Sequence, residues 1–356
     1  MVRIPESPEA IHPAWLTQAL SERYPGVRVV DVEVAERHEV TNAHARLRMR
    51  YDPAAGAPEA MFCKMLPTVE ARRRAIALTG MGVREAQFYE RLAPHLAIRV
   101  PDVYLARCDE SDGSFVVLLE DLQRSGCRFS DGTKGVAVDD AATALEDLAE
   151  LHLRFADAEL RREKAAWVPP PIYDPSYVNA LLSHGLRHHS ERFSKTFAAI
   201  ASLYAANAAA LHSLWEQGPI AVIHGDPHIG NLFDDRGRVG FLDWGLLSTG
   251  NPLRDVSYFL AMALSIDDRR ANERALLRHY LDVCAARGRA WVGFDEAWRT
   301  HRLHAAYCVV AACQVAAFPE KTSRGRRIFA DAFLARAEAA IQDLDAAGAL
   351  RECGIR

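Results

Sequence analysis

The sequence has few of the features that mark secreted, membrane-spanning or nucleic-acid-binding proteins. Its 356 residues include 7 cysteines, an odd number with no Cys-x-x-Cys pair, which is typical of reduced cytosolic thiols. The formal net charge of -4 provides no basic field for nucleic acid. The longest apolar stretch, residues 305–318, is too short to span a bilayer, and residues 1–26 lack the apolar core of a signal peptide. We therefore expect a cytoplasmic protein with neither a nucleic-acid nor a membrane partner.

What the chain does have is an ordinary globular composition, with 49% apolar and 25% charged residues. Its length is sufficient for two lobes with separate cores. No internal repeat or low-complexity tract interrupts it. Composition therefore indicates a soluble enzyme or binding protein, and the choice between them depends on motifs.

The most informative segment begins at residue 224 and reads His-Gly-Asp-Pro-His-Ile-Gly-Asn. An apolar run precedes it and predicts a short strand, which Gly225 and Pro227 end, so that Asp226 lies on a loop. Two further short strands, at 232–233 and 239–242, predict a hairpin because the connection between them contains Asp and Gly.

A hairpin returns its two ends to one place. Asn231 at its start and Asp243 at its end should therefore converge beside Asp226. Phosphoryl transfer requires a carboxylate that orients the attacking hydroxyl and oxygen ligands that hold Mg²⁺ on the nucleotide phosphates. These three residues could supply both, so the pattern predicts a magnesium-dependent phosphotransferase.

A second interpretation of the same segment is a metal hydrolase. On a regular strand His224, Asp226 and His228 would face one side and could ligate a metal. Pro227 argues against a regular strand there. We expect both histidines to be structural, with His224 hydrogen-bonded under the loop.

The eight-residue string, followed by Leu-Asp-Trp-Gly at 242–245 and Arg-Asp-Val at 254–256, resembles the active-site signature of the aminoglycoside phosphotransferase and choline-kinase-like superfamily. Members of that superfamily have the protein-kinase fold, an α+β fold with a small antiparallel sheet lobe and a larger helical lobe. The resemblance implies that Asp226 is the catalytic base. It also implies that Asn231 and Asp243 bind Mg²⁺, and that Asp255 braces the catalytic loop from the start of a helix.

The first third of the chain has the pattern of the smaller lobe. Residues 30–35 and 47–51 alternate between apolar and polar, and residues 60–65 form a third strand candidate that carries Lys64 in an apolar setting. A helical pattern follows at 69–92, with a break at 80–82. Lys64 is the natural phosphate-binding lysine, although strand lysines are mostly surface residues. Its predicted partner is Glu85, with Glu70 and Glu90 as competitors; Glu85 is preferred because its surroundings resemble the corresponding helix of the family.

Strand candidates at 103–107 and 115–119 lead to a segment that resembles the linker between lobes. There the backbone of Glu120 and Leu122 would meet the adenine edge. We accordingly predict a nucleotide-binding lobe at 1–119, a linker at 120–124 and a helical lobe at 125–356. Asp139 should cap the first helix of that lobe, and later helices are expected near 176–190, 194–217, 253–265, 269–287, 294–316 and 323–346.

Kinase-like enzymes usually close a glycine-bearing loop over the nucleotide phosphates, because glycine permits close approach of the backbone. The corresponding loop here, residues 39–45, contains no glycine. Thr41, Asn42 or His44 would meet the phosphates instead, and the donor is ATP, with GTP also possible.

The acceptor is predicted from what the helical lobe lacks. An aminoglycoside kinase should present carboxylates to a polycation, and no such cluster is evident near the chain end. Residues 305–318, flanked by Arg302 and His304, suit a partly apolar alcohol, although most of that stripe is expected to be core. Some strings also resemble the ecdysteroid-kinase-like branch of the family. The alternatives are an aminoglycoside or macrolide antibiotic phosphotransferase and, in another class, an inactive nucleotide-binding pseudokinase. The oligomeric state is left open.

Overall fold

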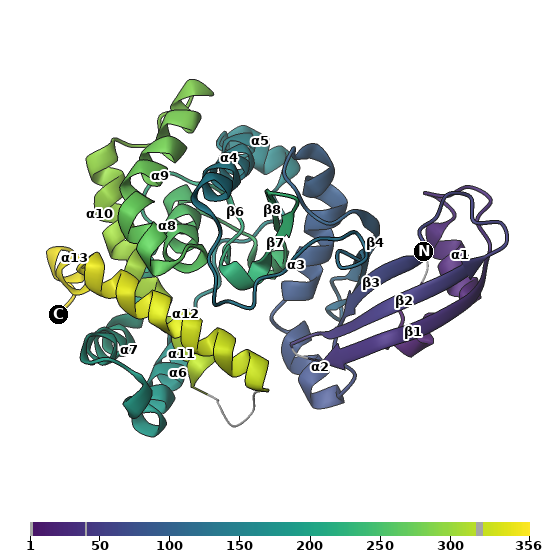
Figure 1. Cartoon of the computed structure of the whole chain (residues 1–356), viewed down its shortest axis with the longest axis horizontal. Coiled ribbons are helices and arrows are strands. Elements are labelled where there is room, and N and C mark those ends of the chain that lie inside the picture. Colours follow the sequence, from purple (N-terminus) through teal and green to yellow (C-terminus); the bar gives the residue numbers. More distant parts are fainter. Residues whose placement is uncertain (1–2, 40, 318–322) are drawn as a thin grey trace. The chain divides into compact units, whose positions relative to one another are not determined.

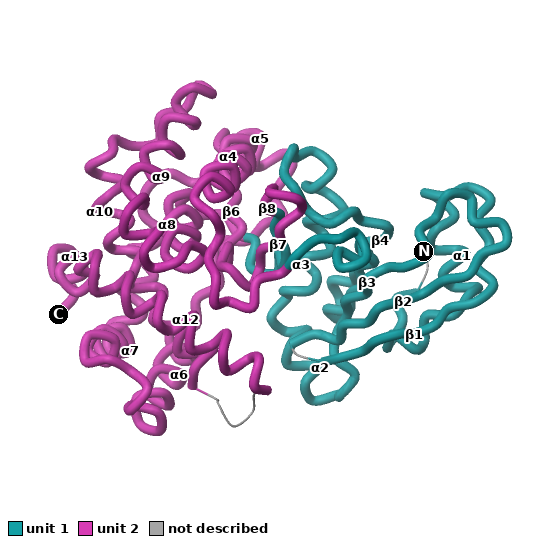
Figure 2. The backbone as a smooth tube through the Cα atoms, viewed as in Figure 1, with its two compact units in different colours: residues 1–128, 240–247 teal, residues 129–239, 248–356 magenta. Residues whose placement is uncertain are grey.

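The computed structural model describes residues 3–39, 41–317 and 323–356, and it divides into two compact units (Figures 1 and 2). Unit 1 comprises residues 1–128 and 240–247, and unit 2 comprises residues 129–239 and 248–356. The chain therefore enters unit 1 a second time for one short segment, which carries Asp243. The functional division at residues 120–124 stays a prediction.

Unit 1 is built on a five-stranded antiparallel sheet with the order β1-β2-β3-β5-β4 (Figure 1). Successive side chains of a strand point to opposite faces of the sheet, so Leu47 and Met49 are buried, whereas Arg48 and Arg50 are exposed. The predicted strands are all present. Their bounds are β1 Val29–Glu39, β2 Ala43–Tyr51, β3 Ala60–Met65, β4 Val103–Asp109 and β5 Ser114–Glu120.

The connection between β1 and β2 is shorter than predicted. Glu39 pairs with Ala43, and Ala45 also lies within the β1–β2 ladder, so the strands run almost to the turn. The predicted loop at 39–45 thus reduces to residues 40–42, of which residue 40 lies outside the described residues. A hydrogen-bonded ladder extends as far as both chains stay extended, and no glycine or proline stops it here.

The helices of unit 1 pack beside this sheet. The helical pattern at 69–92 was predicted to break near residues 80–82, and the structure confirms this, because Gly80 adopts a left-handed conformation (φ 66°). Helix α1 was not predicted; Pro13 occupies its first position and His12 Nδ1 accepts a hydrogen bond from the Trp15 amide. The bounds are α1 Pro13–Leu20, α2 Glu70–Ala77 and α3 Met81–Gln87, which continues through a wider turn at Phe88–Leu92.

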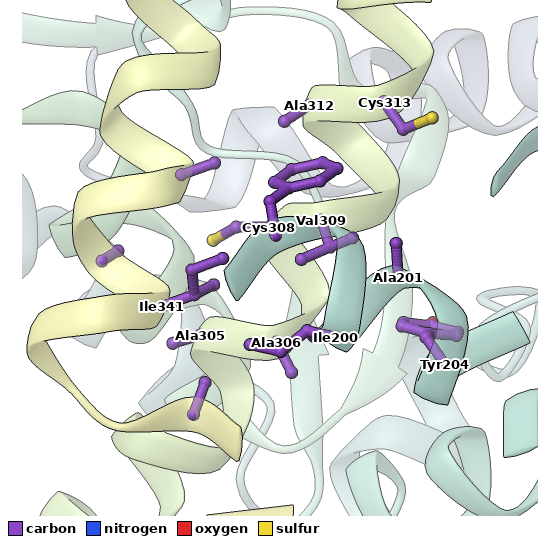
Figure 3. Close-up of a cluster of buried hydrophobic side chains, with 14 of the residues drawn as sticks. Ile200, Ala201, Tyr204, Ala305, Ala306, Cys308, Val309, Ala312, Cys313 and Ile341 are labelled. Atoms are coloured by element: carbon purple, nitrogen blue, oxygen red, sulfur yellow. The ribbon is translucent and has the colours of Figure 1, made fainter. Parts of the chain in front are cut away.

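Unit 2 is mostly helical and has an extensive apolar core (Figure 1). Figure 3 shows part of this core, where side chains from α7, α11 and α12 meet, among them Ile200, Val309 and Ile341. The helices are α4 Val138–Arg154, α5 Ala158–Lys164, α6 Pro175–His188, α7 Lys195–Trp215, α8 Pro252–Ala263, α9 Ile266–Ala286, α10 Phe294–His304, α11 Cys308–Ala316, α12 Arg324–Asp343 and α13 Ala346–Glu352.

Two helix predictions need correction. Asp139 is not the cap of α4: the capping position is Ala137, without a side-chain hydrogen bond, and Asp139 lies in the first turn, where a carboxylate interacts favourably with the helix dipole. The helix predicted at 294–316 is interrupted by a tighter turn at Ala305–Tyr307, which separates α10 from α11.

Among the described helices, α7 is long and apolar enough to cross a membrane by length and composition. Several of its apolar residues, among them Phe197, Tyr204 and Leu211, belong to the core of unit 2.

Short strands carry the motif segment. Strands β6 Ala221–Ile223 and β9 Ser248–Gly250 pair antiparallel within unit 2, and β7 Leu232–Asp235 pairs with β8 Arg238–Phe241 as the predicted hairpin. Its turn is tighter than the predicted connection, because Arg236 (φ 56°) and Gly237 (φ 89°) are both left-handed, as two-residue hairpin turns require.

Candidate active site

The loop predicted to carry Asp226 is present in unit 2, directly after the buried strand β6. Gly225 is left-handed (φ 87°), and the chain turns there before Asp226. Asn231 donates from Nδ2 to Asp226 Oδ2 and to the Asp226 carbonyl, both at 2.9 Å. This bond confirms that Asn231 lies beside Asp226.

The two histidines of the loop hydrogen-bond to its backbone. His224 is fully buried, and its Nδ1 accepts from the Asp226 amide at 3.2 Å. His228 Nδ1 accepts from the Gly230 amide at 2.9 Å, and its Nε2 lies 3.5 Å from Asp226 Oδ2. Within the described ranges no group of three or more His, Cys, Asp or Glu side chains is arranged to hold a metal. The structural role expected for both histidines is therefore confirmed.

Asp255 binds the backbone of the loop that carries Asp226. It lies in the first turn of α8, is 1% exposed, and accepts hydrogen bonds from the amides of His224 (2.6 Å) and Gly225 (2.9 Å). Burial raises the pKa of Asp255, but the hydrogen bond to His152 and these backbone bonds outweigh it and hold the pKa below its usual value. The bracing position predicted for Asp255 is thus confirmed.

His152 links the Asp255 carboxylate to a second helix. It is fully buried in α4, with Nε2 3.2 Å from Asp255 Oδ2 and Nδ1 2.8 Å from the Tyr280 hydroxyl. A chain of contacts therefore runs from α9 through α4 to the loop that carries Asp226. The sequence contains no local signal for this link, because the partners are separated by more than one hundred residues.

The second group of predicted residues is assembled in unit 1. Lys64 Nζ on β3 lies 2.6 Å from Glu85 Oε2 on α3, which confirms the predicted pair and its choice over Glu70 and Glu90. Lys64 Nζ also lies 2.9 Å from Asp243 Oδ1, a contact that was not predicted. Burial lowers the pKa of Lys64, but the carboxylates of Asp243 and Glu85 outweigh it and raise the pKa above its usual value.

Asp243 reaches Lys64 because the segment 240–247 is packed into unit 1. The Trp244 ring stacks on Phe88 with centroids 3.6 Å apart, and Arg84 Nε donates to the Gly245 carbonyl at 2.8 Å. Asp243 itself is left-handed (φ 58°), an uncommon conformation for a residue other than glycine. Trp244 and Phe241 are both buried core residues.

The predicted nucleotide-contacting residues lie at two other places in unit 1. Glu120 is the last residue of β5. Its carboxylate accepts a hydrogen bond from Arg99 at 3.0 Å, and its backbone amide donates one to the Asp102 carbonyl. Leu122 is buried in the following turn. In the β1–β2 connection Thr41 is exposed, whereas Asn42 is buried and its Oδ1 has no hydrogen-bond partner among the described residues. Their nucleotide contacts stay predictions.

Glu85 provides a test of the buried pair in unit 1. Burial raises the pKa of Glu85 to about 7 from 4.5, with Asp243 adding to the rise and Lys64 opposing it. Because the folded state favours protonated Glu85, the contribution of Glu85 to the unfolding free energy is fully present below pH 4.5. This contribution is lost as the pH rises through about 7. Relative to Glu85→Gln, the wild type should therefore lose roughly 1–3 kcal/mol of unfolding free energy over that range.

Denaturant unfolding of both proteins at about pH 5 and about pH 8 measures this difference. The matched control is Glu90→Gln, which removes an exposed carboxylate that pairs with Arg107 at 3.1 Å. Between the two pH values, the unfolding free energy of Glu90→Gln should change by the same amount as that of the wild type. If the unfolding free energies of the wild type and Glu85→Gln changed equally, the raised pKa of Glu85 would be contradicted.

Comparison with known proteins agrees with this arrangement. The family model described as "Phosphotransferase enzyme family" matches residues 72–294, more than half of the chain. The chain belongs to the phosphotransferase enzyme family. The match spans α3 with Glu85, the loop with Asp226, and α8 with Asp255. A comparison with curated proteins found no match.

Solved structures share the fold of this phosphotransferase. The GDP complex of wild-type aminoglycoside 2′-phosphotransferase-IIIa superposes with a TM-score of 0.51 at 13% identity, over 92% of this chain and 98% of that chain. Choline kinase LicA from Streptococcus pneumoniae gives a TM-score of 0.51 at 14% identity, over 93% of this chain and 97% of that chain. The predicted superfamily and its α+β kinase-like fold are thereby confirmed, and family and fold together support a small-molecule phosphotransferase.

Proposed function

We propose that this phosphotransferase transfers the γ-phosphoryl group of ATP, as its Mg²⁺ complex, to a hydroxyl group of a small molecule. The observation that carries the proposal is the bond from Asn231 to the Asp226 carboxylate, on a loop that Asp255 braces. It sets a proton acceptor and a metal-binding amide side by side on rigid backbone. Those are the groups that phosphoryl transfer to an alcohol needs from the acceptor side.

Each residue then has a proposed role. Asp226 orients the acceptor hydroxyl and accepts its proton, while Lys64, anchored by Glu85, neutralises charge on the nucleotide phosphates. The backbone of Glu120 and Leu122 meets the base, and Thr41 and Asn42 meet the phosphates. The unpartnered Asn42 oxygen favours a polar contact at that loop over simple packing.

The residues present suit Mg²⁺ by the chemistry of their donor atoms. Asn231 and Asp243 offer one amide oxygen and one carboxylate, which are the hard oxygen ligands that Mg²⁺ prefers. Asp243 is 46% exposed at its side chain and is therefore accessible to a hydrated ion. When bound, the ion would neutralise charge on the transferred phosphoryl group.

Asp243→Asn should weaken Mg²⁺-dependent nucleotide binding by about tenfold or more, because it replaces a charged ligand by a neutral one. Calorimetric titration with ATP, with and without Mg²⁺, measures the effect. Asp31→Asn is the control, since it removes an exposed carboxylate of the same unit that lies 3.8 Å from Arg50. Equal loss of affinity in the presence and absence of Mg²⁺ would assign Asp243 to the Lys64 pair alone and contradict its role as a ligand.

The acceptor proposed from the sequence, a partly apolar alcohol, is supported by the rings around the catalytic loop. His228 lies 5.0 Å from the Phe333 ring and 6.0 Å from the Tyr258 ring, and Phe329 stacks on Phe333. Most of the stretch at 305–318 is core, as expected. Ala305, Ala306, Cys308 and Val309 belong to the core shown in Figure 3, and Phe318 lies outside the described residues. Arg302 pairs with Asp345 and Glu352.

A mass-spectrometric screen for phosphoryl addition tests the proposal over hydroxy acids, sterols, amino alcohols, amino sugars and macrolides. Parallel reactions with ATP and GTP decide the donor, and GTP is retained because a solved structure with this fold is a GDP complex. Phosphorylation of amino sugars or macrolides alone would favour the antibiotic phosphotransferases over the ecdysteroid-kinase-like branch. Nucleotide binding without ATP hydrolysis or product would favour a pseudokinase, and Zn²⁺ in the purified protein would favour the metal hydrolase.

A further inference from the structure

Arg254 is a buried cation in the first turn of helix α8 of unit 2. It is 7% exposed, and it lies in the first turn of α8, behind the capping residue Asn251. The first turn of a helix is its positive end, so a cation there is repelled by the dipole as well as deprived of water. Among the described residues Arg254 makes no ion pair, although buried charges are normally paired.

The carboxylate next to Arg254 in the sequence is committed elsewhere. Both oxygens of Asp255 accept backbone hydrogen bonds from the catalytic loop, and Oδ2 also contacts His152. The guanidinium instead lies against two aromatic rings, 4.8 Å from the Tyr307 centroid and 5.4 Å from the Tyr173 centroid. Burial lowers the pKa of Arg254, but the two tyrosines and the neighbouring Asp255 outweigh it and raise the pKa above its usual value. The guanidinium is therefore kept charged without an ion pair of its own.

The neighbouring histidines do not share this charge. His212 stacks on Tyr173 with centroids 4.2 Å apart, and burial, followed by the charge of Arg254, lowers the pKa of His212 to about 4. Burial lowers the pKa of His304 to about 3, and Arg254 contributes to that shift as well. Both rings are therefore neutral at physiological pH, and Arg254 is the permanent cation of this cluster.

Two tyrosines connect Arg254 to the catalytic loop. Tyr307, which lies against Arg254, is 5.4 Å from Tyr258 between ring centroids, and Tyr258 is 6.0 Å from His228, whose Nε2 is 3.5 Å from Asp226 Oδ2. Burial raises the pKa of Tyr258, and the nearby Asp226 carboxylate raises it further. The Tyr258 side chain is 3% exposed, and its hydroxyl has no hydrogen-bond partner among the described residues.

We propose that Arg254 binds a carboxylate of the acceptor whose hydroxyl is presented to Asp226. This inference rests on the proposed function and specifies its substrate class: a hydroxy acid in which an apolar segment separates the two polar groups and lies along Tyr258 and Tyr307. The carboxylate would neutralise Arg254 and meet the positive end of α8. The same cation disfavours polycationic acceptors such as aminoglycosides, because like charges would be brought together away from water.

The test compares each of a series of aryl and alkyl hydroxy acids with its own methyl ester and amide as acceptor. The wild type should prefer the acids. Arg254→Met should reduce kcat/KM for the acids by about 10-fold to 100-fold, mainly through KM, while kcat/KM for the esters changes little. For the acids, kcat/KM of Arg254→Lys should lie between those of the wild type and Arg254→Met, because the ammonium group keeps the charge but loses the bidentate geometry.

The matched control is Arg274→Met, which removes an exposed arginine that lies 4.2 Å from the Trp298 ring in the same unit. Its acid and ester kinetics should match the wild type. Equal losses for acids and esters in Arg254→Met would show that Arg254 only packs the core, and a wild-type preference for esters or amides would also overturn the proposal.

A binding measurement separates this inference from the proposed function. Calorimetry of the wild type, Arg254→Lys and Arg254→Met with para-hydroxyphenylacetate, its methyl ester and phenyl phosphate requires no turnover. Tighter binding of the carboxylate than of the ester, lost in Arg254→Met that still unfolds cooperatively, supports the acid site even if no phosphoryl transfer is detected. Preference for phenyl phosphate over the carboxylate, or equal binding of acid and ester, contradicts it.

Discussion

Asp226→Asn should lower turnover by about a hundredfold to ten-thousandfold, the usual contribution of a positioned general base. Asparagine keeps the size of the side chain and can still bond to Asn231, but it cannot accept the proton of the acceptor hydroxyl. Nucleotide binding should be nearly unchanged, because the lysine and carboxylate group of unit 1 is intact. Steady-state kinetics and ATP titration of the same variant measure both quantities.

The control for this substitution is Asp267→Asn, which neutralises an almost fully exposed carboxylate of unit 2. It should retain wild-type turnover. Near-normal turnover in Asp226→Asn would remove Asp226 from the role of base and, with it, the proposed mechanism.

Asp255→Asn should be the most destabilising substitution in the catalytic region, by about 2–4 kcal/mol. An amide offers one acceptor where the carboxylate offers two, so one of the His224 and Gly225 amides loses its partner in a buried site. The loop that carries Asp226 is thereby released, and turnover should fall together with stability. Denaturant unfolding and turnover, measured on the same preparation, provide the readout.

Asp295→Asn is a control matched to Asp255 in position. Asp295 is also in the first turn of a helix, α10, but it is exposed. Asp295→Asn should lower the unfolding free energy only by the interaction of the carboxylate with the helix dipole, about 0.3–1 kcal/mol. If Asp255→Asn cost no more than Asp295→Asn, the bracing role would be wrong.

The pH dependence of the same contact has a definite sign. The pKa of Asp255 is lowered in the folded protein, because its hydrogen bonds outweigh its burial. Its stabilisation is therefore present above the unfolded value of 3.8 and is lost as the pH falls below it. This is opposite to Glu85, whose contribution is lost on raising the pH, so the two substitutions are distinguished by their pH profiles as well as by their positions.

Much of the catalytic loop could be predicted from the sequence because its signals are local. Gly225 and Pro227 end a strand, and a hairpin follows within a few residues, so backbone preference alone places Asp226 on a loop near Asn231. The pairing of Lys64 with Glu85 was also predictable, since a strand and the next helix of the same small unit are neighbours in most folds. The roles assigned to these residues came from the resemblance to a family.

Long-range contacts were beyond such signals. Lys64 and Asp243 are 179 residues apart, and they meet because segment 240–247 joins the packing of unit 1 through Trp244 and Phe88. The contact of His152 with Asp255, 103 residues apart, depends likewise on how α4 packs. The predicted cap at Asp139 and the predicted loop at 39–45 were wrong in their bounds. In both, neighbouring structure decided where a helix or strand begins or ends.

For this phosphotransferase, the sequence by itself determined the reaction class, the strand-loop-hairpin frame of Asp226 and Asn231, and the partner of Lys64, because each follows from neighbouring residues or a recognisable motif. Only the tertiary structure decided which groups brace that frame and where a buried cation lies without an ion pair. Arg254 looks like an ordinary helix residue in the chain. Its burial among aromatic rings depends on where every surrounding element packs, because the energy of a charge is set by its surroundings in space and not by its neighbours in sequence.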